Sequence, residues 1–446
     1  MFFGRVSSRF FQWIRGNSCL QSPEDAATAR ARKLEQKALE RAVKYKRRIK
    51  TYAMRDDAME EALCDFCLNL MRHVDNRPSY VSSPASIALI LAAMTVGAKE
   101  RTLAELKAAL SPADVDQKTF NAFFSQLLKR VAQKSKNGML KAANRIYVDV
   151  DRILLDDFKA QIERLFPGIL KCADFGKAAE TAREINEWAH EMTEGMIPSP
   201  LSADVFSKDE PVVGLNAIFF HCMWEQTFMR SHTHMTEFHF SENDSVTMKM
   251  MSMKEEFLLY AQDDTWQILG MPFEGYQSAM FVFLPKQRFG LATAERTLTG
   301  QNCLQLMKDA GKSVTLLNMY LPRFKVSADL EAKEILQRMG VKSAFDAADA
   351  DFSGMDGDGN AASKLRMGQI AHAAVLEANE WGTKAAALTV VREYTCCGFD
   401  PPPLPVPLFR ADHPFLFFLV HRSSIVFAGR CGDASVLDQT PINYRD

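Results

Sequence analysis

The segment between Leu376 and Leu419 constrains the fold of this chain more than any other stretch. It contains Gly382, which permits backbone conformations that a residue with a Cβ resists. Successive side chains of a β-strand point to opposite faces, so a strand formed from residues 383 to 391 would have one face of small or uncharged residues. These residues are Thr383, Ala385, Ala387, Thr389 and Val391. This face could therefore be buried in a sheet.

The same segment also has the features of an exposed loop. Lys384 falls on the opposite face, and the segment runs into a proline-rich stretch between Pro401 and Pro407. Prolines lack the N–H donors that a continuous sheet ladder needs. The sequence thus predicts an exposed loop that is also able to become a central strand.

Residues 376 to 389 resemble the hinge of the serpins, and residues 409 to 419 resemble the C-terminal signature of that family. Other segments resemble the family in its own order, namely Ser82–Ile87, Ala143–Val148, Gly214–Phe220 with Trp224, and Ala350–Met355. The resemblance covers roughly residues 58 to 446. It implies an α+β serpin fold with three β-sheets, about eight to nine helices and an exposed C-terminal reactive loop.

The N-terminal region differs from the rest of the chain in charge. Residues 1 to 57 carry 14 Lys/Arg against 6 Asp/Glu, a net charge of +8, whereas the remainder carries 40 against 49, a net charge of −9. Residues 30 to 50 have the spacing of a basic helix, which either contacts an anionic surface or is simply solvated. We therefore expect a basic extension over 1–57, partly helical or disordered, and a serpin domain over 58–446.

Periodicity and composition predict regular elements along the domain. Helices are expected at residues 58–75, two between 83 and 110, then 119–135, 178–195 and 330–339. Strands are expected at 144–150, 212–220, 246–253, 257–261, 266–272, 278–284 and 314–324.

The resemblance implies a mechanism of inhibition as a suicide substrate. A protease would cleave the loop, become covalently acylated, and be trapped while the loop inserts into the main sheet. The hinge residues implied are Glu380, Gly382, Thr383, Ala385, Ala386, Ala387 and Thr389. Trp381 and Leu388 are bulkier than the residues usual in the family at these positions.

Counting from the hinge glycine as in inhibitory serpins gives Cys396–Cys397 as the reactive bond, with Arg392 as the second choice. A cysteine at the cut does not define the target, so a serine protease is favoured by the resemblance and a cysteine protease stays open. The rival is a non-inhibitory serpin that serves as a carrier, storage protein or chaperone. Charged or bulky inward hinge residues would favour the rival, and they are absent.

The family also implies a polar network beneath the main sheet, formed by Ser83, Ser86, Asn216 and His372, with Trp224 at the top of the sheet. Buried polar side chains need partners, and exchangeable partners would allow two strands to part and close again. A static hydrogen-bond network would contain the same residues, so the alternatives stay open.

Basic residues cluster at the end of the helix predicted over 119–135. In some serpins the corresponding helix binds polyanions such as glycosaminoglycans. The possible site here comprises Lys129, Arg130, Lys134, Lys136 and Lys141. Solvated surface charge is the simpler interpretation.

The sequence contains no phosphate-binding loop, nucleophile elbow or zincin motif, so we expect neither an enzyme nor a cofactor or metal. The nine cysteines show no disulfide framework, and Cys64 and Cys67 are expected to be buried in a helix. No transmembrane segment is predicted, and the chain is expected to be a monomer. The family resemblance suggests an extracellular location, although no signal peptide is recognisable, and a cytoplasmic location is the alternative.

Overall fold

The computed structural model describes residues 57–74, 77–132, 138–197, 201–356, 365–382 and 406–442, together with Gln36, Glu40 and Val43. The remaining residues of the basic extension lie outside this part of the chain. Within the described residues, the α-helices are α3 Ala58–His73, α4 Pro84–Met94, α5 Glu100–Leu110, α6 Gln117–Ala132, α7 Asp156–Leu165, α8 Ala178–Met192, α9 Leu291–Thr297, α10 Gly300–Lys312 and α11 Ala332–Arg338. None of the described helices is both long and apolar enough to cross a bilayer.

Fourteen strands lie in the same described ranges. They are β1 Tyr80–Ser82, β2 Gly138–Asp149, β3 Leu170–Ala173, β4 Val212–Cys222, β5 Thr233–His239, β6 Ser245–Gln262, β7 Trp266–Pro272, β8 Ser278–Pro285, β9 Val314–Pro322, β10 Phe324–Glu331, β11 Met367–Ala378, β12 Leu408–Arg410, β13 Phe415–His421 and β14 Ser424–Cys431.

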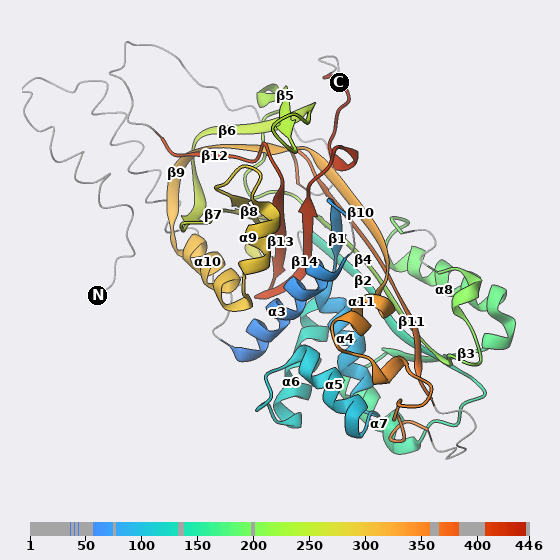
Figure 1. The fold of residues 1–446 in the computed structure, drawn as a ribbon. Coiled ribbons are helices and arrows are strands. Elements are labelled where there is room, and N and C mark those ends of the chain that lie inside the picture. Colours follow the sequence, from blue (N-terminus) through green and yellow to red (C-terminus); the bar gives the residue numbers. More distant parts are fainter. Residues whose placement is uncertain are drawn as a thin grey trace, which may run out of the picture.

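A five-stranded sheet forms one wall of the molecule, in the order β10-β11-β4-β2-β3 (Figure 1). Its two central strands, β11 and β4, are parallel, whereas their other neighbours in the centre, β10 and β2, pair with them antiparallel. Both central strands are almost wholly buried. This matches the long apolar run predicted for residues 212 to 220, because a strand covered on both faces needs no polar alternation.

The other strands form a nine-stranded sheet in two parts that share β6. The first half of β6 pairs with β5, and its end pairs with β7, while β9 lies along both halves. A bulge between Met253 and Glu256 bends β6, and Glu255 there has a φ of 50°. One bent strand therefore replaces the two strands predicted over 246–253 and 257–261. With the five-stranded sheet, these two parts account for the three sheets expected, and the predicted fold class is confirmed.

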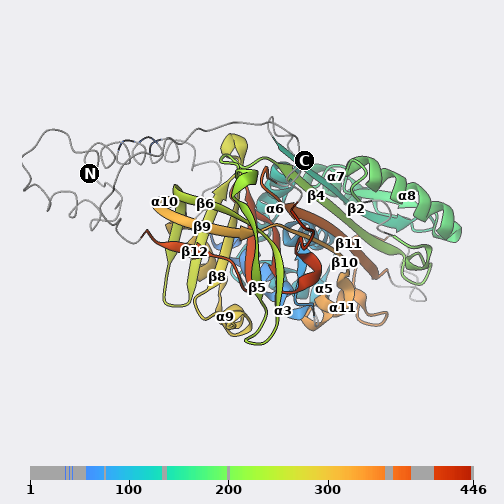
Figure 2. The ribbon, with the colours of Figure 1, turned by 90° about the horizontal axis from the view of Figure 1, so that it is seen from above.

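Helices cover the five-stranded sheet on both faces (Figures 1 and 2). On one face lies α4, all of whose residues are buried in the main core. On the other face, α8 packs Ala182, Ile185 and Ala189 against the sheet in a smaller core. Each side chain of β4 and β11 therefore belongs either to the face toward α4 or to the face toward α8.

Most predicted elements are present with shifted ends, but some were missed. The single strand expected over 314–324 is β9 followed by β10, which separate at Arg323. The prediction contained neither α7 nor α10. In α10 the buried Cys303, Leu304, Met307 and Ala310 have helical spacing, so this pattern could have revealed it. Cys64 and Cys67 are both buried in α3, as predicted.

Candidate functional site at the hinge

The chain reverses direction immediately after β11, in a tight turn from Asn379 to Gly382. The backbone N–H of Asn379 donates to the carbonyl of Gly382 (2.9 Å), and the N–H of Gly382 donates back to the carbonyl of Asn379 (3.3 Å). This pair of bonds closes a hairpin whose two central residues are Glu380 and Trp381. The segment from residue 383 to residue 405 follows it and lies outside the described residues.

Gly382 already lies against the end of β4. It forms an antiparallel bridge with Met223, and its φ is 147°. A Cβ at this position would lie 2.1 Å from the carbonyl oxygen of Cys222 and 2.7 Å from the Cα of Met223. Only glycine fits here, because both the close approach and the positive φ exclude a side chain.

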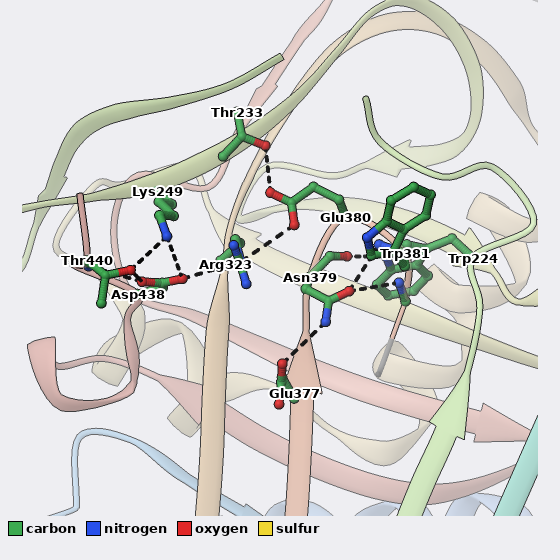
Figure 3. Close-up of polar contacts among 11 residues, drawn as sticks. Trp224, Thr233, Lys249, Arg323, Glu377, Asn379, Glu380, Trp381, Asp438 and Thr440 are labelled. Atoms are coloured by element: carbon green, nitrogen blue, oxygen red, sulfur yellow. Dashed lines mark hydrogen bonds and ion pairs between the residues drawn. The ribbon is translucent and has the colours of Figure 1, made fainter. Parts of the chain in front are cut away.

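Trp224 holds the turn from the side of β4 (Figure 3). Its indole Nε1–H donates to the carbonyl of Asn379 (2.8 Å), and its backbone N–H donates to the carbonyl of Trp381 (2.8 Å). Its ring stacks on Phe273, with 4.4 Å between centroids. Trp224 thus lies at the top of the five-stranded sheet and contacts the hinge directly.

Glu380 is anchored on the opposite side of the turn. Its side chain is only 6% exposed, accepts a hydrogen bond from Oγ1 of Thr233 (2.8 Å), and lies 3.5 Å from Nε of Arg323. Its carbonyl accepts the N–H of Phe228 (2.9 Å). A buried carboxylate needs such partners, so Glu380 keeps the turn docked only while they stay in place.

Arg323 connects the hinge to the C-terminal segment (Figure 3). Its Nε also lies 3.4 Å from Asp438, and Asp438 in turn pairs with Lys249 (3.3 Å). Burial acts to raise the pKa of Asp438, but hydrogen bonds from Thr440 and the charges of Arg323 and Lys249 outweigh it and hold this pKa below its usual value. Asp438 therefore remains ionised beside Arg323.

The two central strands separate toward the hinge. The parallel ladder between β11 and β4 begins at Met367 and Val212 and ends at Val375 and Phe219. Beyond that point, β11 continues to Ala378 and β4 to Cys222, outside this ladder. The hairpin of the hinge lies over the place where the two strands part.

Below this point, His372 of β11 lies beside Asn216 of β4 in the same register. The backbone N–H of Ser83 donates to Nε2 of His372 (3.0 Å), so Nε2 must be unprotonated. Nδ1 therefore carries the proton and donates to Oδ1 of Asn216 (2.8 Å). Complete burial lowers the pKa of His372 to about 3, which keeps the ring neutral.

The contacts of the two serines differ from those implied by the family resemblance. Ser83 reaches His372 through its backbone N–H, and its hydroxyl caps α4 by accepting the N–H of Ser86 (3.3 Å). The Ser86 hydroxyl and the side-chain nitrogen of Asn216 have no hydrogen-bond partner among the described residues. The network thus contains a hydroxyl group and an amide group that can still form hydrogen bonds, and an exchange of partners requires such groups.

The possible polyanion site is not a continuous exposed patch over the residues that can be described. Arg130 points inward, 2.6 Å from the buried carboxylate of Glu60, and Lys141 lies 3.4 Å from Glu194. Lys129 is exposed. Lys134 and Lys136 lie outside the described residues. Arg130 is engaged in holding α6 on α3, so it is not a free ligand for an anion.

Most residues of the predicted loop also lie outside the described part of the chain. These are the hinge positions Thr383, Ala385, Ala386, Ala387 and Thr389, and the reactive-bond positions Arg392, Cys396 and Cys397. The functional residues predicted from the sequence did not include Asn379, Arg323 or Asp438. Asn379 stands three residues before a glycine, a spacing typical of turns, whereas no local pattern links Arg323 with Asp438.

Known proteins of one family are similar to this chain in sequence. The family model described as serpin (serine protease inhibitor) matches residues 61–434. Serpin B8 of Bos taurus is 32% identical over 385 residues, which cover 84% of this chain and 99% of that protein. Leukocyte elastase inhibitor A of Mus musculus is 34% identical over 356 residues, which cover 78% and 91%.

Solved structures agree with these sequence matches. The native state of the thermophilic serpin Tengpin aligns with a TM-score of 0.75 at 25% identity, covering 85% of this chain and 95% of that one. Serpin48 of the insect Tenebrio molitor aligns with a TM-score of 0.71 at 25% identity, covering 86% and 100%. These comparisons do not support the extracellular location suggested by the family resemblance.

Proposed function

Because this chain belongs to the serpin family, we propose that it is a protease inhibitor that acts as a suicide substrate. A target protease would attack the carbonyl carbon of Cys396, form an acyl bond with it, and release the amine of Cys397. The freed end of the loop would then insert between β11 and β4. The attached protease would be carried along and distorted before water hydrolyses the acyl bond.

The hairpin at the hinge is the observation that carries this proposal. Gly382 already pairs antiparallel with Met223, the residue after β4, and with Asn379, the residue after β11. It is therefore the first residue of a strand that fits between the two central strands. Insertion would extend a hairpin that exists, instead of nucleating a new strand.

These two pairings also determine the register of insertion. In an antiparallel ladder, each step of one residue forward along the loop corresponds to a step of one residue back along the neighbouring strand. Thr389 would thus face His372 on one side and Asn216 on the other. The first residue follows from the pairing of Gly382 with Asn379, and the second from its pairing with Met223. The two counts agree, because His372 and Asn216 are observed as partners in the ladder between β11 and β4. The Thr389 hydroxyl would enter the polar network and could use its free hydrogen-bonding capacity.

The same register accommodates the remaining loop side chains. Loop residues an even number of positions from Thr389, such as Ala385 and Ala387, would point to the same face of the sheet as Thr389. There they would lie beside the β4 and β11 residues that face α4. Leu388 would face α8 in a row with Ala373 and Ala217, two small residues. Its extra size relative to the alanine usual in the family is therefore tolerable.

Insertion must break the contacts that hold the exposed state. The parallel ladder between β11 and β4 and the bond from His372 to Asn216 would both open. New antiparallel ladders on both sides of the loop strand would replace them, and apolar burial would add roughly 25 cal/mol per Å². The inserted state is thus the more stable one once the loop is cut.

The target protease and the cellular location are further parts of the proposal. Cys396–Cys397 is the proposed reactive bond, with Arg392 as second choice, and a serine protease is favoured over a cysteine protease because Mus musculus leukocyte elastase inhibitor A is among the relatives. We place the protein in the cytoplasm, since six cysteines of the described part are free thiols, five of them buried. Residues 1–57 precede the segment matched by the family model and form the proposed extension.

The test is incubation with a panel of serine and cysteine proteases, followed by denaturing electrophoresis. We expect a covalent complex with at least one protease. The variant Thr389→Arg would place a charge in the buried row and should be cleaved without trapping, whereas the matched variant Thr389→Ser should still trap. If every protease cuts the wild-type loop and departs active, the inhibitor function is wrong and the carrier, storage or chaperone role gains support.

A further inference from the structure

We propose that Asn379 is the positioning residue of the hinge: its side chain holds the hairpin turn in the shape from which insertion starts. The inference rests on the proposed function and adds a residue that is not among the hinge residues implied by the resemblance. Figure 3 shows Asn379 between Trp224, Trp381 and Glu377.

The side chain of Asn379 binds the turn from inside. Its Oδ1 accepts the backbone N–H of Trp381 (3.0 Å) and that of Gly382 (3.3 Å). Its Nδ2 donates to Oε1 of Glu377 on β11 (3.2 Å). One amide group therefore connects both arms of the hairpin.

The backbone of the same residue is also fully used. Its N–H donates to the carbonyl of Gly382, and its carbonyl accepts both the Gly382 N–H and the indole N–H of Trp224. Asn379 is 2% exposed, so water cannot replace these partners. Every polar group of Asn379 thus serves to fix the turn.

The turn needs this support because of its composition. Its central residues, Glu380 and Trp381, are not among the described residues with positive φ, so the turn is not of the primed type in which central glycine or asparagine supplies the reversal. The central residues therefore do not favour the reversal by themselves. An asparagine at the first position supplies the missing stabilisation, since its side chain can accept the N–H groups of the residues that follow.

The consequence for inhibition is kinetic. If the turn opened, Gly382 would lose its place opposite Met223, and insertion would first have to form the turn again. Only the fraction of molecules with a closed turn would be competent. A slower insertion gives the protease time to deacylate and escape.

The experiment follows insertion without requiring inhibition. The loop is nicked with a non-target protease, and the intrinsic tryptophan fluorescence, to which Trp224 and Trp381 beside the turn contribute, is recorded over time together with the urea midpoint for the wild type and Asn379→Ala. The rescue variant combines Asn379→Asp with Glu377→Gln, which keeps the acceptor for the turn and reverses the donor and acceptor of the side-chain pair. We expect insertion to be about tenfold slower in Asn379→Ala and close to wild type in the rescue variant.

The possible outcomes separate this inference from the function on which it rests. Equal insertion rates in wild type and Asn379→Ala would overturn the positioning role while leaving the inhibitor function intact. A rescue variant as slow as Asn379→Ala would also overturn it, because then the hydrogen bonds of the turn do not set the rate. A wild-type protein that gains no stability after nicking would instead refute insertion itself.

Discussion

Acidification should weaken the contact between the two central strands through His372. The ring is fully buried, and this burial lowers its pKa to about 3, whereas an unfolded histidine titrates near 6.5. Between these two values the unfolded state binds more protons than the folded state. The contribution of His372 is therefore fully present above pH 6.5 and is lost progressively as pH falls.

The size of the loss follows from the difference in proton binding. At pH 5 the unfolded histidine is almost fully protonated and the folded one is not, so the free energy of unfolding should fall by about 2 kcal/mol relative to pH 7.5. His421, whose pKa is lowered to about 4 mainly by burial, should contribute about the same again. Burial raises the pKa of Glu60 and Glu295, which acts in the opposite direction on acidification, so the contribution of each histidine is read from the difference between the wild type and a variant that lacks it.

Urea unfolding of the protein with an intact loop, at pH 7.5 and pH 5.0, measures this loss. The loss in His372→Gln should be about 2 kcal/mol smaller than the loss in the wild type, since one of the two histidines is gone. His421→Gln is the matched control and should show the same reduction. A loss in His372→Gln as large as in the wild type would refute the assignment of a neutral, buried ring.

The opening should also be visible as a structural change. The folded ring stays neutral at pH 5, but a ring exposed by local opening is protonated there, and a protonated Nε2 cannot accept the N–H of Ser83 until it releases its proton. The protection factors of the β11 and β4 amides, which correct for the slower intrinsic exchange at pH 5, should therefore fall before global unfolding.

Three further changes test other contacts. Glu380→Gln removes the charge that pairs with Arg323 and should lower the stability of the uncleaved protein by about 1–3 kcal/mol in urea unfolding; a change below 0.5 kcal/mol would contradict the anchoring role of this carboxylate. Gly382→Ala should displace the hinge, because its Cβ would lie 2.1 Å from the carbonyl oxygen of the residue at the end of β4, and the variant should be cleaved by proteases without forming a complex on denaturing gels; efficient trapping would show that the hinge does not need this close approach. Arg130→Met leaves Glu60 buried and unpaired, so we expect a destabilisation of about 3–5 kcal/mol. The salt concentration that elutes the protein from a heparin column should not change, and elution at lower salt would show that Arg130 belongs to a polyanion site.

Much of the fold could be predicted from local patterns. The apolar run of β4 indicated a strand covered on both faces, and the alternation of small residues after Gly382 indicated a segment able to enter a sheet. Both predictions depend only on the period of side chains along a strand. The bend of β6 was missed because a bulge is determined by its partner strands and leaves no clear mark in composition.

The candidate site was predictable only in part. His372 and Asn216 were recognised by resemblance, but the sequence could not show that Ser83 acts through its backbone N–H or that burial keeps the ring neutral. Arg130 was taken for exposed charge, and its inward orientation became visible only once α3 supplied the buried carboxylate of Glu60.

The sequence by itself therefore predicted a segment able to be both loop and strand, since this expectation rests on the size and order of neighbouring side chains. The tertiary structure decided what restrains the turn that precedes this segment. Arg323 and Asp438 are 115 residues apart, yet they form an ion pair, and Arg323 also contacts Glu380 in the turn that begins at Asn379. Hydrogen bonds and ion pairs act over a few ångströms of space regardless of separation along the chain, so no local pattern could have revealed this restraint.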